Sequence, residues 1–206
     1  MKRGIISIIT FGLFFWPSLA KATLITIEIE GMVDSVRDEG NYLEGEIMPG
    51  DIIAGFYTYE STTPDSSPLD PVVGHYYHYS PPAGVSLTLG SFNFKTDPAN
   101  VDFLVGVGND GPSDIYWFIS YNNIPLSNGT LVESIWWQLN DNTGSALSSD
   151  ALPTIPPTLY RWQANVLCLH GERSRYIVYA HVTSAIPEPS TILLFSLGVV
   201  FIKRRR

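Results

Sequence analysis

Residues 24–30 read Leu-Ile-Thr-Ile-Glu-Ile-Glu, and this alternation of apolar and polar side chains indicates the fold class. Successive side chains of a β-strand point to opposite faces of a sheet, so the three isoleucines share one face. The threonine and the two glutamates share the other face, which predicts a half-buried strand. No window of the sequence sustains the i, i+3, i+4, i+7 apolar pattern of an amphipathic helix.

The same period of two recurs along the chain between segments rich in turn residues. Many short strands with such turns predict an all-β fold, an antiparallel β-sandwich or jelly-roll-like domain. The alternation changes phase at Gly90-Ser91, which predicts a β-bulge. Residues 170–173 are expected to join the last two strands in a hairpin. After the first strand we expect strands at 52–60, 74–79, 85–94, 101–107, 115–121, 131–140, 159–169 and 176–183.

The first 22 residues have the order of a secretory signal peptide. Lys2-Arg3 precedes an apolar stretch over 4–16, and Ala20-Lys21-Ala22 follows it. A basic region, an apolar region and small residues at the cleavage site are the signature of such a peptide. The expected signal-peptidase site is at Ala20 and Ala22, with a mature start at Thr23. The alternative is an uncleaved N-terminal anchor helix, although a span of the ~30 Å hydrocarbon core needs about 20 residues.

The C-terminal end has three parts. Residues 186–191 read Ile-Pro-Glu-Pro-Ser-Thr, and these prolines are expected to end any strand because proline has no N–H to donate. An apolar run over 192–202 follows, and four cations close the chain. A basic cluster after an apolar run stays on the cytoplasmic side of a membrane, so the body upstream is expected outside.

This ending resembles the PEP-CTERM sorting signal of Gram-negative bacteria, in which a Pro-Glu-Pro motif precedes a transmembrane helix and an arginine-rich end. The resemblance implies recognition by an exosortase, a membrane-embedded cysteine transpeptidase that cuts near the motif, and transfer to the cell surface or extracellular matrix. Members of this family often occur in species that make exopolysaccharide. By the resemblance, the recognition triplet is Pro187, Glu188 and Pro189, and the stop-transfer end is Lys203, Arg204, Arg205 and Arg206.

The apolar run departs from the family pattern in its length. Its eleven residues make a helix of about 16 Å, roughly half the hydrocarbon thickness. Stable spanning and complete removal of the tail are both open. The predicted organisation is therefore a signal-peptide helix at 1–22, a β-sandwich ectodomain at 23–185, and a sorting tail with a short hydrophobic helix at 186–206.

Charge limits the partners of the body. The chain has 12 basic and 20 acidic residues, but residues 23–186 hold 19 of the acids and only five of the bases. A net charge of −14 repels phosphate backbones, so no nucleic-acid partner is expected. Cys168 is the only cysteine, which excludes an intramolecular disulfide. It alternates with polar residues in 159–169, which favours packing on the apolar face of a strand over a reactive thiol.

Metal sites have two sets of candidates. His75 and His78 are three apart on a strand and point to opposite faces, so they are not expected to chelate one ion together. His170 and His181 come from the two strands of the expected hairpin, and nothing in the sequence fixes whether they converge. Calcium needs six to eight oxygen ligands, which acidic loops can supply, although Asp and Asn are also ordinary turn residues. The candidate loops hold Asn109, Asp110 and Asp114, then Asn140, Asp141 and Asn142, and finally Asp65 and Asp70.

Carbohydrate binding is the other candidate activity, because aromatic side chains exposed on a sheet can stack on sugar rings. Aromatic residues also fill sandwich cores. Trp136 and Trp137 are adjacent, so one of them is expected to point outward. The other aromatic candidates are Tyr57, Tyr59, Tyr76, Tyr77, Tyr79, Tyr116, Trp117 and Tyr121.

No serine-elbow, phosphate-loop or zinc-protease motif occurs, so we do not expect an enzyme. Glu44 and Glu46 could share a strand face as paired glycosidase carboxylates, or lie on a solvated edge. The sequence thus predicts an exported, non-catalytic surface or matrix protein without a resident cofactor. Its expected partners are the export machinery, signal peptidase, exosortase and the membrane. A carbohydrate-binding module acting on exopolysaccharide is the alternative, and a polysaccharide hydrolase is a third.

Overall fold

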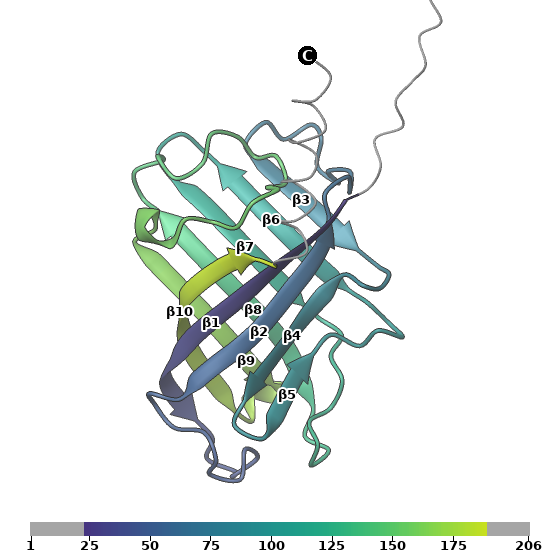
Figure 1. Cartoon of the computed structure of the whole chain (residues 1–206), viewed down its shortest axis with the longest axis vertical. Coiled ribbons are helices and arrows are strands. Elements are labelled where there is room, and N and C mark those ends of the chain that lie inside the picture. The colour runs from purple at the N-terminus through teal and green to yellow at the C-terminus, as the bar shows by residue number, and fades with distance from the viewer. Residues whose placement is uncertain (1–22, 189–206) are drawn as a thin grey trace, which may run out of the picture.

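The computed structural model describes residues 23–188, and these form one antiparallel sheet of ten strands (Figure 1). The all-β prediction is confirmed. The sheet order is β3-β6-β7-β8-β9-β10-β1-β2-β4-β5. The strands are β1 (Leu24–Arg37), β2 (Ile52–Glu60), β3 (Val73–His78), β4 (Gly84–Leu89), β5 (Phe92–Lys95), β6 (Phe103–Asn109), β7 (Asp114–Ser120), β8 (Val132–Asp141), β9 (Ala164–Gly171) and β10 (Ile177–Pro187).

The sheet curls so that its two halves face each other across one core, which gives a sandwich-like arrangement (Figure 1). Tyr57 on β2 packs its ring 4.7 Å from that of Phe118 on β7. An isolated bridge between Thr96 and Asn123 links the segment after the edge strand β5 to the segment after β7. The Tyr57 and Tyr116 hydroxyls are 3.0 Å apart inside the core. Hydrophobic burial over both inner faces therefore closes the fold, and the Tyr57 and Tyr116 hydroxyls pair with each other inside it.

Three local predictions are wrong. Gly90 and Ser91 form a two-residue hairpin turn, because Leu89 pairs with Phe92 across it and Gly90 takes a φ of 59°. The strand expected from residue 159 begins at Ala164, after a one-turn 3₁₀ helix (Leu159–Arg161). The expected hairpin of β9 and β10 is confirmed, with a second 3₁₀ turn (Glu172–Ser174) at its tip.

The third correction concerns the strand end at the prolines. β10 runs on to Pro187, which pairs with Ile27 of β1, and the Glu188 N–H donates to the Thr26 carbonyl at 3.1 Å. Since hydrogen bonds to one neighbour alternate along a strand, the nitrogen of Pro187 points away from β1 and its missing proton leaves no gap in this ladder. The described part of the fold therefore extends into the Pro-Glu-Pro triplet, beside the start of β1.

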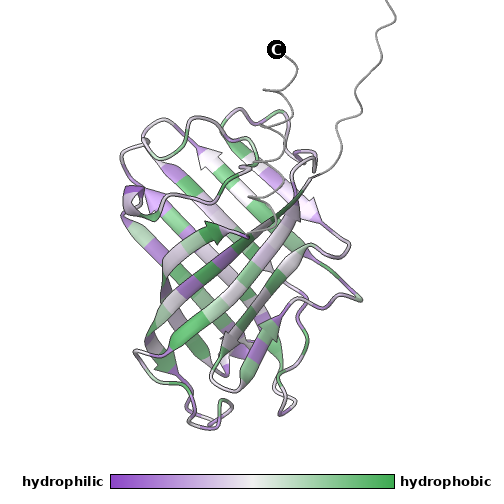
Figure 2. Cartoon of the chain, in the orientation of Figure 1, coloured by the Kyte–Doolittle hydropathy of each residue, from purple (hydrophilic) through white to green (hydrophobic). Residues whose placement is uncertain are grey.

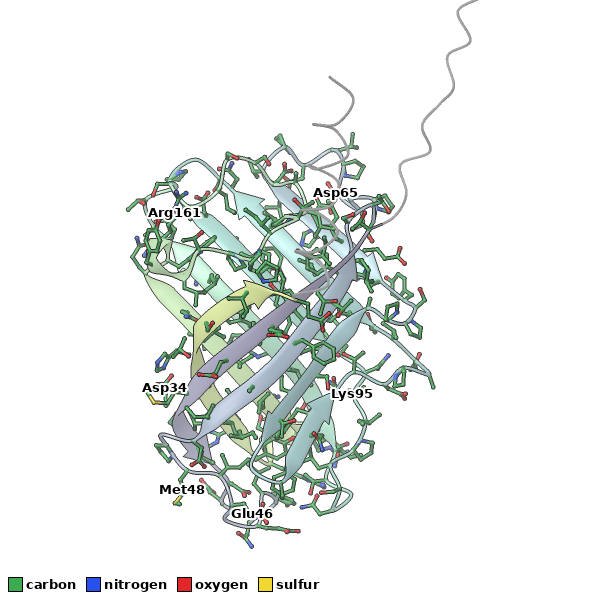
Figure 3. The ribbon with its side chains drawn as sticks, in the orientation of Figure 1. Asp34, Glu46, Met48, Asp65, Lys95 and Arg161 are labelled. Carbon is green, nitrogen blue, oxygen red and sulfur yellow. The ribbon has the colours of Figure 1, made fainter. Side chains whose placement is uncertain are left out.

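The predicted signal-peptide helix at 1–22 and the predicted short hydrophobic helix of the apolar run at 192–202 lie outside the described residues. Within residues 23–188, no helix is long and apolar enough to cross a lipid bilayer. Asp65 and Arg161 lie at the end of the sheet where β1 begins and β10 finishes, whereas Glu46 and Met48 lie at the opposite end (Figure 3).

Candidate ligand-binding surface

Five neighbouring strands, β3, β6, β7, β8 and β9, carry one charged side chain at their outward positions in the part of the chain described, that of Glu133 near the start of β8. The exterior of an antiparallel sheet is usually polar. Apart from Glu133 it is aromatic, aliphatic or uncharged polar here, and we call it the aromatic face. Its residues are Val73, His75, Tyr77, Leu104, Gly106, Gly108, Ile115, Trp117, Ile119, Ser134, Trp136, Gln138, Asn140, Ala164, Val166, Cys168 and His170.

The outer surface of β1, β2, β4 and β5 is different, and we call it the charged face. Hydrophilic and hydrophobic residues alternate along these strands (Figure 2). The outward residues include carboxylates, a lysine, small hydroxyl side chains and the exposed apolar side chains of Leu24, Met32, Ile52 and Phe56. The others include Thr26, Glu28, Glu30, Asp34, Ala54, Glu60, Ser86, Thr88, Asn93 and Lys95.

Trp117 is held flat on the aromatic face. Its indole lies over Gly106 of β6, where the Cβ of any other residue would overlap the ring. The His75 ring stands at 75° to the indole with centroids 5.7 Å apart. His75 is itself fixed, since its Nδ1 lies 3.1 Å from the Ser67 hydroxyl and its backbone N–H donates to Asp65 at 2.9 Å. The Trp117 indole is thus held by Gly106 beneath one ring face and by His75 beside it, and its other ring face points outward.

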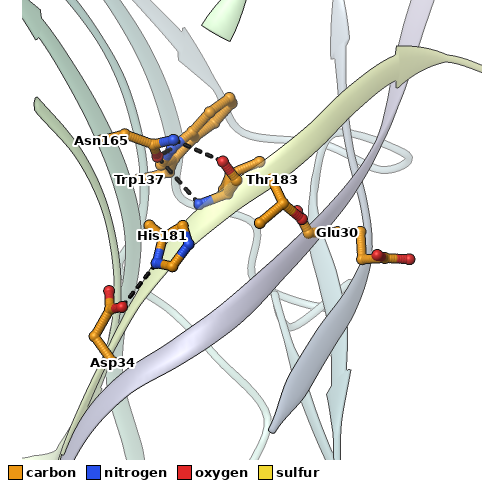
Figure 4. Close-up of polar contacts among 7 residues, drawn as sticks. Glu30, Asp34, Trp137, Asn165, His181 and Thr183 are labelled. Atoms are coloured by element: carbon orange, nitrogen blue, oxygen red, sulfur yellow. Dashed lines mark hydrogen bonds and ion pairs between the residues drawn. The ribbon is translucent and has the colours of Figure 1, made fainter. Parts of the chain in front are cut away.

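The paired tryptophans of β8 divide between the two sides of the sheet, as predicted. Trp137 is completely buried, and its Nε1–H donates to Asn165 Oδ1 at 2.8 Å (Figure 4). The Asn165 amide also bonds both backbone groups of Val182, where β9 and β10 are no longer paired. Trp136 points outward, half-buried between Ile119 and Cys168 in the ladder.

Tyrosines extend the aromatic face beyond the strands. Tyr77 and Tyr79 stack with their rings 6.0 Å apart and 4° from parallel, and Tyr79 is 69% exposed. Burial and the neighbouring Tyr77 and Asp102 raise the pKa of Tyr121. Tyr179 on β10 lies opposite Cys168. It is not among the aromatic candidates identified from the sequence, although its alternation with Val178 and Ala180 indicates an outward position. Of the other aromatic candidates, the structure places Tyr57, Tyr59, Tyr76 and Tyr116 in the core.

Cys168 is buried as predicted, but on the outer side of the sheet. It is 1% exposed and lies between Trp136 and Tyr179, whereas its neighbours Leu167 and Leu169 face the core. Burial raises the pKa of this thiol to about 12, so the nucleophilic thiolate is suppressed. Cys168 therefore contributes packing beneath the aromatic face.

The histidines do not form a shared metal site. His75 points outward and His78 is buried on the inner side, as predicted. His170 Nδ1 lies 3.6 Å from Glu133, and His181 Nδ1 lies 2.7 Å from Asp34 on another strand pair (Figure 4). Because each has its own partner, the hairpin does not bring them together on one ion.

The acidic loops use their carboxylates to fold the backbone. Asp141 accepts from the Thr143 hydroxyl at 2.6 Å and from the N–H groups of Ser145 and Ala146. The Thr143 hydroxyl and the N–H groups of Ser145 and Thr143 keep the pKa of Asp141 well below its ordinary value, although the residue is buried. Asp114 accepts from the Leu147 N–H. In the described chain no three His, Cys, Asp or Glu side chains are grouped to hold a metal ion.

The other loop carboxylates have similar roles. Asp65 caps the edge strand at His75, and Asp70 accepts from the Val72 N–H. The Asp110 backbone N–H donates to the Ser113 carbonyl, which closes the turn that follows Asn109. After a flip of its amide, Asn109 bonds Asp114 and Ser149. Asn140 accepts from the Gln138 amide, and the Asn142 N–H donates to Gln163.

The suggestion that Glu44 and Glu46 share a strand face is wrong. Both lie in the loop between β1 and β2, where Glu44 has a φ of 56°. Glu44 accepts from the Asn128 amide at 3.1 Å, and Glu46 accepts from the Ser91 hydroxyl. Each carboxylate is therefore tied to a different loop.

Shallow hollows occur away from the aromatic face. One of about 330 Å³ lies over Ala54 and Gly55, between Glu30 and Ile186. Another of about 530 Å³ lies at the opposite end of the sheet, beside Arg37 and Arg175, with the Arg175 guanidinium 5.5 Å from the centre of the Tyr42 ring. The second hollow is also lined by Ser174, whose hydroxyl lies 3.2 Å from His170 Nε2, and His170 Nδ1 lies 3.6 Å from Glu133.

Comparison with known proteins identifies one segment of this all-β chain. Residues 185–206 match the family model of the PEP-CTERM protein-sorting motif. The chain therefore carries the C-terminal sorting signal of an exported protein, as the resemblance indicated. No curated protein and no solved structure was found to match the chain. Of the sorting residues, Pro187 and Glu188 lie in the described fold, while Pro189, Lys203 to Arg206, Ala20 and Ala22 lie outside it.

Proposed function

We propose that this chain is a surface or extracellular-matrix protein that exosortase processes at Pro187-Glu188-Pro189, and that its ectodomain acts by binding, without catalysis. The sorting motif at residues 185–206 carries this proposal. In it, signal peptidase acts after Ala22, and Lys203 to Arg206 hold the tail at the inner membrane until the motif is cut.

The layout of the two fold ends supports this processing route. The Thr23 carbonyl accepts from the Ser61 N–H, and Glu188 is bonded to Thr26, so both expected cleavage regions lie at one end of the β1–β10 pair. Removal of both flanks leaves every strand of the sheet in place. A tethered precursor would thus stand with this end toward the membrane and the opposite end away from it.

Mass spectrometry of the protein recovered from the host cell surface tests the processing. We expect a start at Thr23 and an end within or soon after Pro187-Glu188-Pro189. Recovery of intact Met1 and intact Arg206 in the same surface molecule would contradict the proposal. Substitution of Glu188→Ala is expected to leave the precursor in the inner membrane, with Glu172→Ala as a control acid outside the motif.

The second candidate is a carbohydrate-binding module for exopolysaccharide, and the aromatic face favours it. Flat rings at Trp117, Trp136 and Tyr77 are exposed or half-buried on a rigid sheet, which is the arrangement that stacks on sugar rings. A glycan array probed with the processed protein tests this candidate, and an absence of binding to every glycan rejects it. We expect no release of reducing sugar from any bound polymer, as a non-catalytic domain requires.

A further inference from the structure

We propose that the aromatic face takes an uncharged polysaccharide chain, which lies across the strands with Trp117 and Trp136 as its stacking rings. This inference rests on the carbohydrate-binding candidate above and names its ligand class and its direction on the sheet. Four features of the surface support it: a continuous row, two oriented rings, a single carboxylate (Glu133) at one end of β8, and uncharged polar groups on the same strand as Trp136.

The row is set by strand register. Six outward residues on six consecutive strands lie directly opposite one another, from β3 to β10. Neighbouring strands are about 4.8 Å apart, so the row covers about 24 Å, enough for an extended oligosaccharide. Each strand contributes one side chain to the row, so a polysaccharide that follows the row runs across the strands. In order, the row is Tyr77, Leu104, Ile119, Trp136, Cys168 and Tyr179.

The two indoles give this surface its flat rings: Trp136 lies in the row and Trp117 lies beside it. Trp117 is fixed between Gly106 and His75, so little side-chain entropy is lost when a ring stacks on it. Trp136 is its diagonal neighbour, because Trp117 lies opposite Gln138 and Trp136 lies opposite Ile119. Neither indole N–H donates a hydrogen bond to another described residue, so both are available to sugar hydroxyls.

The charge distribution selects an uncharged ligand. A carboxylated or sulfated chain would meet a body of net charge −14 and no cation on the face to pair with. A polycation would be drawn to the acidic loops instead of the face. A second copy of the chain would bring two acidic bodies together, which opposes face-to-face pairing. Gln138, Asn140 and Ser134 offer uncharged hydrogen-bonding groups on the same surface.

Calorimetric titration of the processed protein with three oligosaccharide probes tests the inference. The probes are cellohexaose (neutral), an alginate hexamer (anionic) and a chitosan hexamer (cationic), each in 0.1 M salt. We expect saturable binding of cellohexaose and at least tenfold weaker binding of the other two. Preferential binding of alginate or chitosan would overturn the uncharged-ligand inference while leaving carbohydrate binding intact. No binding of any probe would reject both for these glycans.

Substitutions locate the site. Trp117→Ala and Trp136→Ala are each expected to weaken cellohexaose binding about tenfold or more, a factor that corresponds to about 1.4 kcal/mol. Phe56→Ala, an exposed aromatic on the charged face, is the matched control and is expected to leave affinity unchanged. Tyr79→Ala and Tyr179→Ala remove exposed rings and serve if a tryptophan variant does not fold. Unchanged binding in all four face variants would place the ligand elsewhere.

Analytical ultracentrifugation of the same proteins tests whether a second copy of the chain occupies the aromatic face instead. A concentration-dependent dimer that Trp136→Ala dissociates would assign the aromatic face to a second copy and overturn the inference. A monomer at all concentrations is the expected result.

Discussion

The two outer surfaces of the one curled sheet differ in almost every respect except backbone geometry. The charged face, on β1, β2, β4 and β5, carries four carboxylates and a lysine among short polar side chains. The strands of the aromatic face, β3, β6, β7, β8 and β9, carry only one such charge, Glu133 near the start of β8, and this face has two half-buried tryptophans. Both surfaces are outer faces of an antiparallel sheet, and such faces are usually polar. Contact with solvent therefore does not explain why one of them is rich in aromatic side chains.

The difference indicates that the aromatic face is built as a second packed layer outside the core. Leu104 and Cys168 are fully buried although they point away from the inner cluster. Their burial depends on the rings around them, so substitutions on this face should affect stability as core substitutions do. Substitutions at the charged face should have the small effects of ordinary surface positions.

The largest expected contrast comes from placing a carboxylate on each face. Trp136→Glu buries a charge between Ile119 and Cys168 and removes a ring, so we expect a loss of about 3 kcal/mol in unfolding free energy. Phe56→Glu on the charged face is expected to cost less than about 1 kcal/mol. Urea denaturation followed by far-UV circular dichroism measures both. Equal losses would show that the two faces do not differ in packing.

Acid sharpens the contrast between the two sides of β3. Burial lowers the pKa of His78 to about 4, and its Nε2 has no partner among the described residues. The pKa of a histidine in the unfolded chain is about 6.5. Above that pH both states hold a neutral His78 and the folded state keeps its full stability. As the pH falls toward 4, the unfolded state takes up a proton first, so the free energy of unfolding decreases. We expect a loss on the order of 2 kcal/mol by pH 5. His78→Phe should flatten this dependence, whereas His75→Phe, on the outer side, should leave it.

The close approach at Gly106 gives the next effect in size. Gly106→Ala places a Cβ where the Trp117 indole lies and displaces the ring. We expect the free energy of unfolding to fall by about 1.5 kcal/mol because of this overpacking. In a Trp117→Ala background the same substitution should cost nothing, because the obstructing ring is gone. A double-mutant cycle in urea measures the coupling. Additive effects would mean that Trp117 does not depend on Gly106 for its position.

The strand pattern could largely be predicted from the sequence. The segment expected at 52–60 coincides with β2, and most other strands start and end within a few residues of their predicted bounds. The errors occur where one sequence pattern is compatible with two backbone structures. A phase change at glycine fits a bulge or a tight turn, and a proline fits a strand end whose nitrogen faces away from its partner.

The candidate site could be predicted only in part. On β9 both sets of alternating positions are apolar around Cys168, so alternation does not reveal which side meets the core. Trp136 and Trp137 present the same ambiguity on β8, although one outward ring was expected. The aromatic face also requires the order of five strands, including the pairing of β3 with β6 across two intervening strands. That pairing depends on long-range burial, which single-strand patterns do not record.

The smallest expected effect belongs to the charged face. The Asp34 carboxylate lies 2.7 Å from His181 Nδ1, but both side chains are more than a third exposed, so water and salt screen the contact. Asp34→Asn is therefore expected to change the unfolding free energy by less than about 1 kcal/mol, and less still in high salt. Urea titrations at low and high salt, with His181→Asn and the double variant, measure the contact itself. A coupling above about 2 kcal/mol would mean that electrostatics stabilises the β1–β10 pair as strongly as packing stabilises the aromatic face, and the contrast between the two surfaces would no longer hold.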